Sequence, residues 1–176
     1  MISTRLVNDD DLTHTTIKRI TDLINQVYAV AEADLWKAGL ATRTNREEIE
    51  NFIRDKALII AEKDGYIVGV CKVSIESNET GEFGMLAADP ARRGIGIGRE
   101  LVNAAENWAR HLGFKTMRLE LLTPRHWKND SKEFLKIWYD RLGYKPSYTL
   151  PFEELFAHRI NDFATDCDFT VWLKEL

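Results

Sequence analysis

The chain of 176 residues has only two cysteines, no long hydrophobic run and no excess of positive charge. Cys71 and Cys167 stand far apart in apolar segments, so we expect reduced core thiols in a cytoplasmic protein, with a disulfide between them as the alternative. No apolar stretch approaches the length that spans a bilayer, and the N-terminus lacks the pattern of a signal peptide. The net charge of −4 disfavours a general nucleic-acid-binding role. We therefore expect neither a membrane nor a nucleic acid as partner.

Metal-ligand patterns are also missing, because the four histidines are scattered without ligand spacing, and we expect no metal site. What the chain does have is a composition that is 44% hydrophobic and 30% charged. That is enough apolar material for a sizeable core and argues against disorder. The length favours a single domain covering residues 1–176.

The apolar pattern alternates between strand and helix periods along the chain. Strands are expected at Ile2–Val7, Ala57–Ala61, Tyr66–Ile75, Glu82–Ala87, Thr116–Leu122, Tyr144–Leu150 and Phe169–Leu173, with a hairpin turn at Asp64-Gly65. Helices are expected after a cap at Asp10 or Asp11, after a Thr44/Glu47 capping box, from Ile97 to Leu112, and from Asp130 to Leu142, with a loop at Ala33–Arg43. This order predicts a mixed α/β (α+β) fold, with a mixed sheet and helices packed on its faces.

The segment from Asp89 to Arg99 reads DPARRGIGIGR and is the most informative part of the chain. Three glycines alternate with isoleucines directly before an amphipathic helix. Glycine has no Cβ, so backbone N–H groups can press against a ligand, and they would lie at the positive end of the helix dipole. The segment predicts a cradle for a pyrophosphate.

Two common nucleotide motifs do not fit this segment. A G-x-G-x-x-G fingerprint would need its third glycine at Arg99 or Leu101, and no Gly-Lys-Ser/Thr ending is present for a P-loop. The pattern Arg-x-x-Gly-x-Gly fits, through Arg93, Gly96 and Gly98. The remaining alternative, a ligand-free turn between strand and helix, would need one glycine and no flanking arginines.

A second motif lies about forty residues further on, where the stretch from Trp138 to Tyr144 reads WYDRLGY. With these two motifs, the chain resembles the GNAT superfamily of acyl-CoA-dependent N-acetyltransferases, in which the second motif reads Y-x-x-L-G-F. The resemblance covers the chain from its first strand to Tyr144, where phenylalanine is usual. It implies a single GNAT-type domain with a mixed, mostly antiparallel twisted sheet and helices on both faces.

The resemblance also implies acetyl-CoA as the donor, with CoA as the product. Its pyrophosphate would lie on the N–H groups from Arg93 to Arg99, and its pantetheine arm along a strand that splays from the next one. A backbone N–H of Leu86 or Ala87 would polarise the thioester carbonyl. The expected donor site comprises Met85, Leu86, Ala87, Arg92, Arg93, Gly94, Ile95, Gly96, Ile97, Gly98 and Arg99.

Acetyl transfer needs a group that takes a proton from the amine and one that stabilises the departing thiolate. Glu82 and Glu120 are the candidate bases, and the alternative is that they are solvated strand carboxylates. Tyr139 matches the usual general acid of the family, with a hydrogen bond to the thiolate as the safer role and a place in the core as the alternative. Many members carry an asparagine where this chain has Lys132, for which we expect a solvated helix lysine, with a contact to the 3′-phosphate of CoA as the alternative.

For the acceptor, the resemblance points to the first two helices and their loop, where Tyr28, Glu32, Trp36 and Arg43 are candidates. Glu32 and the aromatic rings suit a cationic amine, whereas Arg43 suits a substrate carboxylate. A small-molecule amine is favoured over a protein amine. A non-catalytic CoA-binding module and an enzyme using another acyl group or an alcohol are the alternatives, and exposed C-terminal strands suggest a homodimer.

Overall fold

A single seven-stranded sheet organises the part of the chain that the computed structural model describes, residues 1–40 and 42–176. The expected loop at Ala33–Arg43 includes Ala41, which lies outside the described residues. Neighbouring strands are antiparallel except for the parallel pair at the centre of the sheet, β4 and β5. The strands, in their order across the sheet, are β1 (Ser3–Leu6), β2 (Leu58–Lys63), β3 (Tyr66–Ser77), β4 (Thr80–Ala88), β5 (Thr116–Pro124), β7 (Cys167–Glu175) and β6 (Lys145–Pro151).

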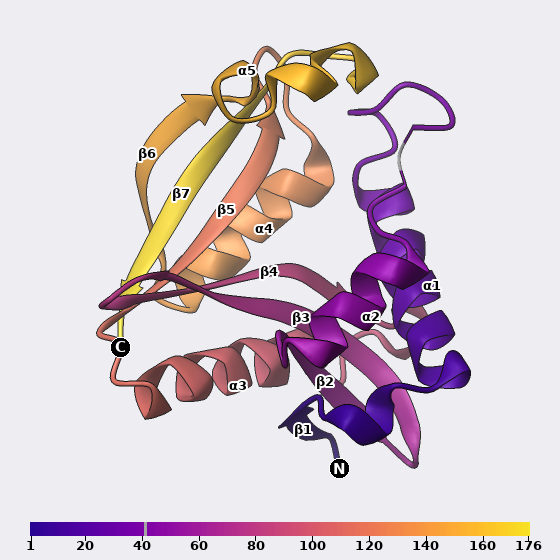
Figure 1. The fold of residues 1–176 in the computed structure, drawn as a ribbon. Helices are drawn as coiled ribbons and strands as arrows, with labels where there is room; N and C mark the ends of the chain where they lie inside the picture. The colour runs from indigo at the N-terminus through magenta and orange to yellow at the C-terminus, as the bar shows by residue number, and fades with distance from the viewer. Residues whose placement is uncertain (41) are drawn as a thin grey trace.

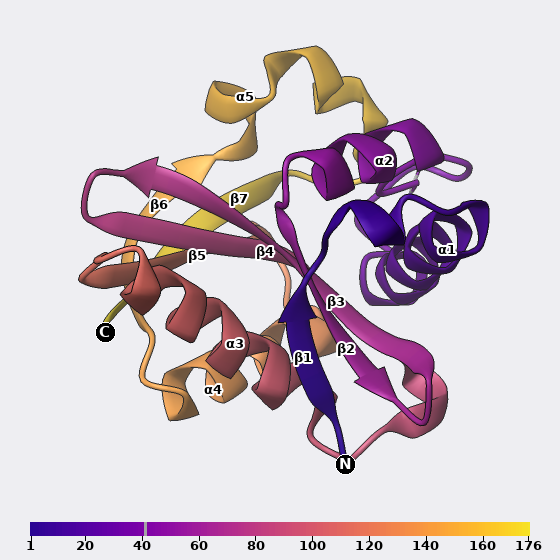
Figure 2. The same ribbon diagram turned by 60° about the horizontal axis from the view of Figure 1, so that its bottom comes forward.

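Helices cover both faces of this sheet, with α1 and α2 on one side and α3 and α4 on the other (Figure 2). One buried cluster packs α1 and α2 on the sheet through residues such as Ile20 and Ile53, and another lies under α3 around Leu101 and Phe83. The expected mixed fold with helices on both faces is confirmed. The helices are α1 (His14–Ala31), α2 (Arg46–Arg54), α3 (Ile97–His111), α4 (Asp130–Arg141) and the short α5 (Phe152–Leu155), with 3₁₀ turns at Asp9–Asp11, Pro90–Arg92 and Ala157–Asp162.

The central strands separate soon after they meet (Figure 1). β4 and β5 are paired from Thr80 to Glu82 only, after which β4 stays with β3 and β5 stays with β7. Met85 has a φ of 48°, and the register of β4 against β3 shifts there, which marks a β-bulge. Backbone groups of β4 beyond Glu82 therefore face an opening on the side of β5.

The cap of α1 differs from the sequence prediction. Thr13, and neither Asp10 nor Asp11, precedes the helix, and its Oγ1 accepts the N–H of Thr16 at 3.1 Å. Asp11 is instead held by Arg5 of β1 at 2.7 Å. Asp11 therefore does not cap α1, because it pairs with an arginine of β1 that the helix pattern does not predict as its partner.

Two further caps are shifted by one residue. Asn45 replaces the expected Thr44 at the start of α2, where its Oδ1 accepts the N–H of Glu48 at 2.9 Å. Asn129 similarly caps α4 in place of Asp130. In each case, two neighbouring polar side chains compete for the same unpaired helix N–H groups, and the asparagine occupies the extended backbone position that a cap requires.

Candidate active site

A cavity of about 1340 Å³ occupies the opening between β4 and β5. It extends from the glycine-rich run at the start of α3, past the bulge at Met85, to the end of α1 and the aromatic residues of the C-terminal segment. Most of the expected site residues line this one cavity. The exceptions are Ala87, which is buried in the core, and Ile95, whose side chain is exposed.

The glycine-rich run leaves helix N–H groups free at one end of the cavity. Gly96 takes the N-cap position of α3 with a φ of 90°, and its missing side chain gives no cap hydrogen bond. The first N–H groups of α3, from Ile97 to Arg99, therefore have no partner within the helix. A Cβ on Gly98 would come within 3.3 Å of Trp138, so the close approach of α3 to α4 also needs glycine.

Arginines surround this helix start. Arg92 Nη1 lies 2.6 Å from Asp89 Oδ2, which Arg19 contacts at 3.0 Å. Burial opposes ionisation of Asp89, but the N–H of Ala91 and the two guanidinium groups prevail and lower its pKa. Arg93 and Arg99 line the cavity and form no ion pair with the described residues. Their charges are available to an anionic ligand at the free N–H groups.

A buried arginine gathers the two candidate bases at the point where β4 and β5 separate. Arg118, 8% exposed, lies opposite Glu82 in the last parallel pair. Its Nη1 is 2.7 Å from Glu76 Oε1 and 3.1 Å from Glu82 Oε2, and its Nη2 is 2.5 Å from Glu120 Oε1. Arg118 was not among the predicted site residues, although its place two residues before Glu120, on the same face of the strand, was a signal for it.

Glu82 differs from Glu120 in its hydrogen bonds, because Arg118 donates one to Glu120 and none to the buried Oε2 of Glu82. Burial raises the pKa of Glu82, Arg118 opposes this effect, and the nearby Glu120 and Glu76 add to it. Glu82 Oε2 is buried, and its contact with Arg118 does not have hydrogen-bond geometry, so this oxygen has no hydrogen bond from the described residues. Glu82 is therefore the carboxylate better suited to accept a proton.

Tyr139 of α4 is 5% exposed and lines the cavity between its two ends. Its ring centroid lies 6.1 Å from that of Phe83 and 5.0 Å from that of Trp138. Burial raises the pKa of Tyr139 far above its usual value. The side chain thus stays a neutral phenol at physiological pH and can donate a hydrogen bond into the cavity.

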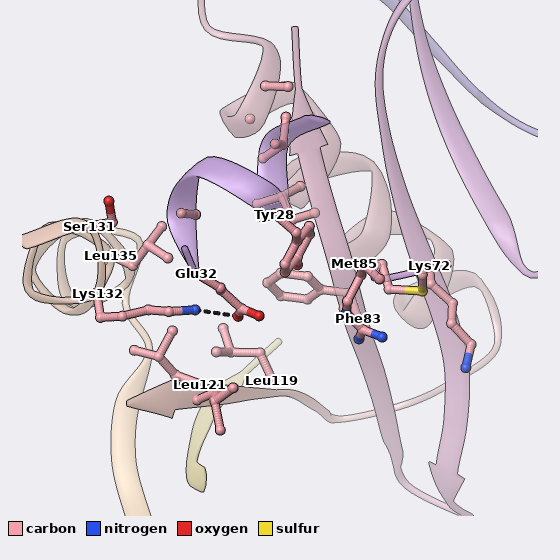
Figure 3. Close-up of a pocket in the computed structure, with 18 of the residues that line it drawn as sticks. Tyr28, Glu32, Lys72, Phe83, Met85, Leu119, Leu121, Ser131, Lys132 and Leu135 are labelled. Atoms are coloured by element: carbon pink, nitrogen blue, oxygen red, sulfur yellow. Dashed lines mark hydrogen bonds and ion pairs between the residues drawn. The ribbon is translucent and has the colours of Figure 1, made fainter. Parts of the chain in front are cut away.

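Lys132 is not the solvated lysine expected from the sequence. It is 3% exposed, and its Nζ lies 2.7 Å from Glu32 Oε1 at the end of α1 (Figure 3). Trp36 Nε1 donates to the other oxygen, Glu32 Oε2, at 2.9 Å. Both oxygens of Glu32 are engaged, and the pair joins α1 to α4 across the cavity, above Leu119 and Leu121 of β5 (Figure 3).

The end of the cavity beyond this ion pair is aromatic and basic. The guanidinium carbon of Arg43 lies 5.4 Å from the ring centroid of Tyr28, and that of Arg159 lies 4.6 Å from the ring centroid of Trp36. Burial raises the pKa of Tyr28 to about 12, and the nearby Arg43 opposes this effect. Tyr28 therefore stays a neutral phenol beside the Arg43 guanidinium group.

Residues 24–136 match the family model described as the acetyltransferase (GNAT) family. The chain belongs to this family. The match confirms the resemblance inferred from the two motifs and the acetyltransferase class that goes with it.

A curated protein is similar to part of this chain. An amino-acid acetyltransferase of Pseudomonas syringae is 34% identical over 94 residues, which are 53% of this chain and 21% of the relative. The chain thus spans about a fifth of the length of the curated relatives that it matches first.

Solved structures share the GNAT fold along the whole chain. A putative acetyltransferase from Salmonella typhimurium, solved with its cofactor acetyl-CoA, has a TM-score of 0.69 at 18% identity and covers 100% of this chain and 94% of its own. An aminoglycoside 6'-N-acetyltransferase complexed with coenzyme A also has a TM-score of 0.69 at 18% identity, covering 99% and 96%. The first of these proteins holds the donor that the sequence predicts for this chain, and the second holds the predicted product, coenzyme A.

In residues 1–40 and 42–176, no helix is long and apolar enough to cross a membrane. The same residues contain no group of three or more His, Cys, Asp or Glu side chains able to hold a metal ion. Cys71 and Cys167 are both buried and free.

Proposed function

We propose that this protein transfers the acetyl group of acetyl-CoA to a primary amine of a small molecule, by direct attack while both substrates are bound. The observation that carries the proposal is the continuous cavity, which joins a helix start suited to phosphate to a carboxylate, a buried phenol and an aromatic end. The proposed setting is the cytoplasm, whose reducing conditions suit the two free thiols. The homodimer stays a prediction.

The donor site fits the residues that are present. The free N–H groups at the start of α3, together with Arg93 and Arg99, would hold the pyrophosphate. The backbone of β4 beyond Glu82, unpaired on its β5 side, would hold the pantetheine amides as a neighbouring strand would. When bound, acetyl-CoA supplies an acetyl group on a thioester. The N–H groups at the bulge, at Leu86 or Ala87, are the candidate donors to the thioester carbonyl.

Glu82 is the proposed general base. An amine with a pKa near 10.4 is almost entirely protonated at pH 7 and needs to lose a proton before its nitrogen can form a bond to carbon. Glu82 accepts that proton, directly or through a water molecule, while Glu120 keeps its contact with Arg118. Tyr139 donates a hydrogen bond to the sulfur as the carbon–sulfur bond breaks, which stabilises the thiolate that leaves.

The release of free CoA thiol from acetyl-CoA tests the proposal directly, across polyamines, amino acids, aminoglycosides and peptides. We expect release that depends on a small amine and yields its N-acetyl product. Tight binding of acetyl-CoA without transfer to any amine would instead identify a non-catalytic CoA-binding module. Release with peptides alone would place the acceptor on a protein.

A further inference from the structure

We propose that the acceptor is an α-amino acid with a bulky apolar side chain, whose carboxylate is bound by Arg43 and Arg159. This inference rests on the proposed function and names the acceptor class of the same cavity. The sequence leaves two alternatives open at this end of the cavity: a cationic acceptor held by Glu32, and an anionic one held by Arg43. The contacts of the two side chains favour the second.

Glu32 has no capacity left for a substrate cation. Lys132 Nζ neutralises its charge at 2.7 Å, and Trp36 Nε1 occupies its second oxygen at 2.9 Å. The carboxylate is only 5% exposed. A substrate ammonium group would need to displace a buried ion pair in order to reach it, which is unfavourable.

The two arginines have donors to spare. Arg43 stacks on Tyr28 and forms no ion pair with the described residues, while Arg159 uses Nε to bind Asp162 at 3.0 Å and stacks on Trp36. Both line the main cavity and also a smaller pocket of about 500 Å³ beside it, so they border a common space from two separate segments. Guanidinium groups bind carboxylates through paired, charge-assisted hydrogen bonds.

Three carboxylates stand near this space: Asp162 pairs with Arg159 Nε, and Glu47 and Glu48 form no ion pair with either arginine. Glu47 lines the smaller pocket alone. Glu48 lines both, and its Oε2 accepts a hydrogen bond from Thr44 Oγ1 at 2.5 Å. Among the described residues, Arg43 is therefore left without an ion-pair partner, and the Nη groups of Arg159 stay free to bind a substrate carboxylate.

The position of Arg43 suits an α-amino acid in particular. Its guanidinium group stacks on the Tyr28 ring, and Tyr28 lines the same cavity as Leu86 of the bulge. The proposed carboxylate site and the bulge proposed for the thioester therefore border the same cavity, with Tyr28 among its lining residues. In an α-amino acid the amine and the carboxylate share one carbon, so a carboxylate bound by Arg43 would keep the amine inside this cavity.

The side chain of the acceptor would lie on an aromatic wall. The ring centroid of Phe152 is 5.2 Å from that of Phe156 and 5.6 Å from that of Phe169, and all three residues line the cavity together with Trp36. Burying apolar surface against these rings favours a phenylalanine-, tryptophan- or leucine-like side chain over a charged one.

The test compares acceptors that differ by the carboxylate alone. We expect kcat/KM for L-phenylalanine and L-tryptophan to exceed that for phenethylamine and tryptamine by at least about tenfold, because a site built for a carboxylate rejects a ligand that lacks it. Calorimetric titration of the protein–CoA complex should show the same order of affinity. Spermidine should be a poor acceptor.

Matched variants assign this preference to the arginines. In Arg43→Gln and in Arg159→Gln, the ratio of kcat/KM between L-phenylalanine and phenethylamine should fall about tenfold or more. Arg54→Gln, which removes an exposed arginine of α2 outside the cavity, should keep the wild-type ratio. Equal or better use of the decarboxylated amines or of spermidine overturns the inference and leaves acetyl transfer to amines intact. Binding of acetyl-CoA with no amine acetylated contradicts the proposed function itself.

Discussion

Tyr139 combines two environments that rarely meet at one side chain. Its ring packs with Phe83 and Tyr144 in the core under α3, yet the residue also lines the cavity. Core packing fixes the ring and burial keeps the phenol protonated, so the hydroxyl is a positioned donor that needs no reorganisation. Tyr139 is therefore both a core residue and a cavity residue, and its catalytic role stays a prediction.

Replacing Tyr139 with phenylalanine isolates the hydroxyl. The packing of the ring should persist, so we expect kcat to fall about a hundredfold while the Kd for CoA stays within about twofold. Steady-state kinetics and calorimetry measure the two quantities. Tyr66→Phe, at an exposed turn tyrosine, is the control that should change neither. Unchanged turnover in Tyr139→Phe would remove the hydroxyl from the mechanism.

In the proposed mechanism, Arg118 sets the pH range in which Glu82 accepts a proton. A base is active when ionised, and burial raises the pKa of Glu82, so kcat/KM should fall as the pH drops through that raised value. Arg118 holds the pKa down, and Arg118→Gln should therefore move the acidic limb to higher pH. Arg118→Lys, which keeps the positive charge, should return the acidic limb part of the way to its wild-type pH. Lys115→Gln, at an exposed lysine beside the start of β5, should leave the limb in place. An acidic limb that does not move in Arg118→Gln would exclude this coupling.

At the scale of elements, α1 and α4 are tied together by one buried ion pair. Lys132→Met leaves the Glu32 carboxylate buried without its partner, and we expect a loss of about 3–5 kcal/mol in the free energy of unfolding. The double variant Lys132→Met/Glu32→Leu should recover most of that loss, because both charges are then absent. Urea denaturation measures both. A double variant no more stable than the single one would show that the packing of Lys132, rather than its charge, matters.

The two ends of α3 offer a matched pair of glycines. Gly96 and Gly113 have φ values of 90° and 83°, and a Cβ on either meets nothing within 4 Å. Alanine at each should cost about 1 kcal/mol of stability through backbone strain. Only Gly96→Ala alters the helix start in the cavity, so it alone should weaken CoA binding. Equal CoA affinities in the two variants would contradict the role assigned to the helix start.

For the molecule as a whole, the order of strands and helices could be predicted because it rests on local periodicity. The glycine that ends α3 and the Asp64-Gly65 turn are fixed by backbone conformation, and the structure has the expected positive φ values at all three residues. The splay of β4 from β5 followed from the family resemblance rather than from any local pattern, and the register confirms it.

What the sequence could not reveal depends on contacts between distant segments. The Glu32–Lys132 pair joins residues one hundred positions apart, and its burial arises only when α1 meets α4 across the sheet. Arg159 reaches Trp36 because a C-terminal 3₁₀ turn, which the periodicity did not predict, folds over the end of α1. A turn this short has too few residues to show a helical period. Of the two arginines at the basic end of the cavity, the sequence therefore predicted Arg43 and not Arg159.

The central claim is that one cavity binds acetyl-CoA at the start of α3 and passes its acetyl group to an amine. The most direct test incubates the protein with acetyl-CoA and a small amine and measures the N-acetylated amine and the free CoA thiol together. We predict that the two products appear in equal amounts and only when the protein and an amine are both present. No acetylated amine, or a protein that does not bind CoA, would contradict the account.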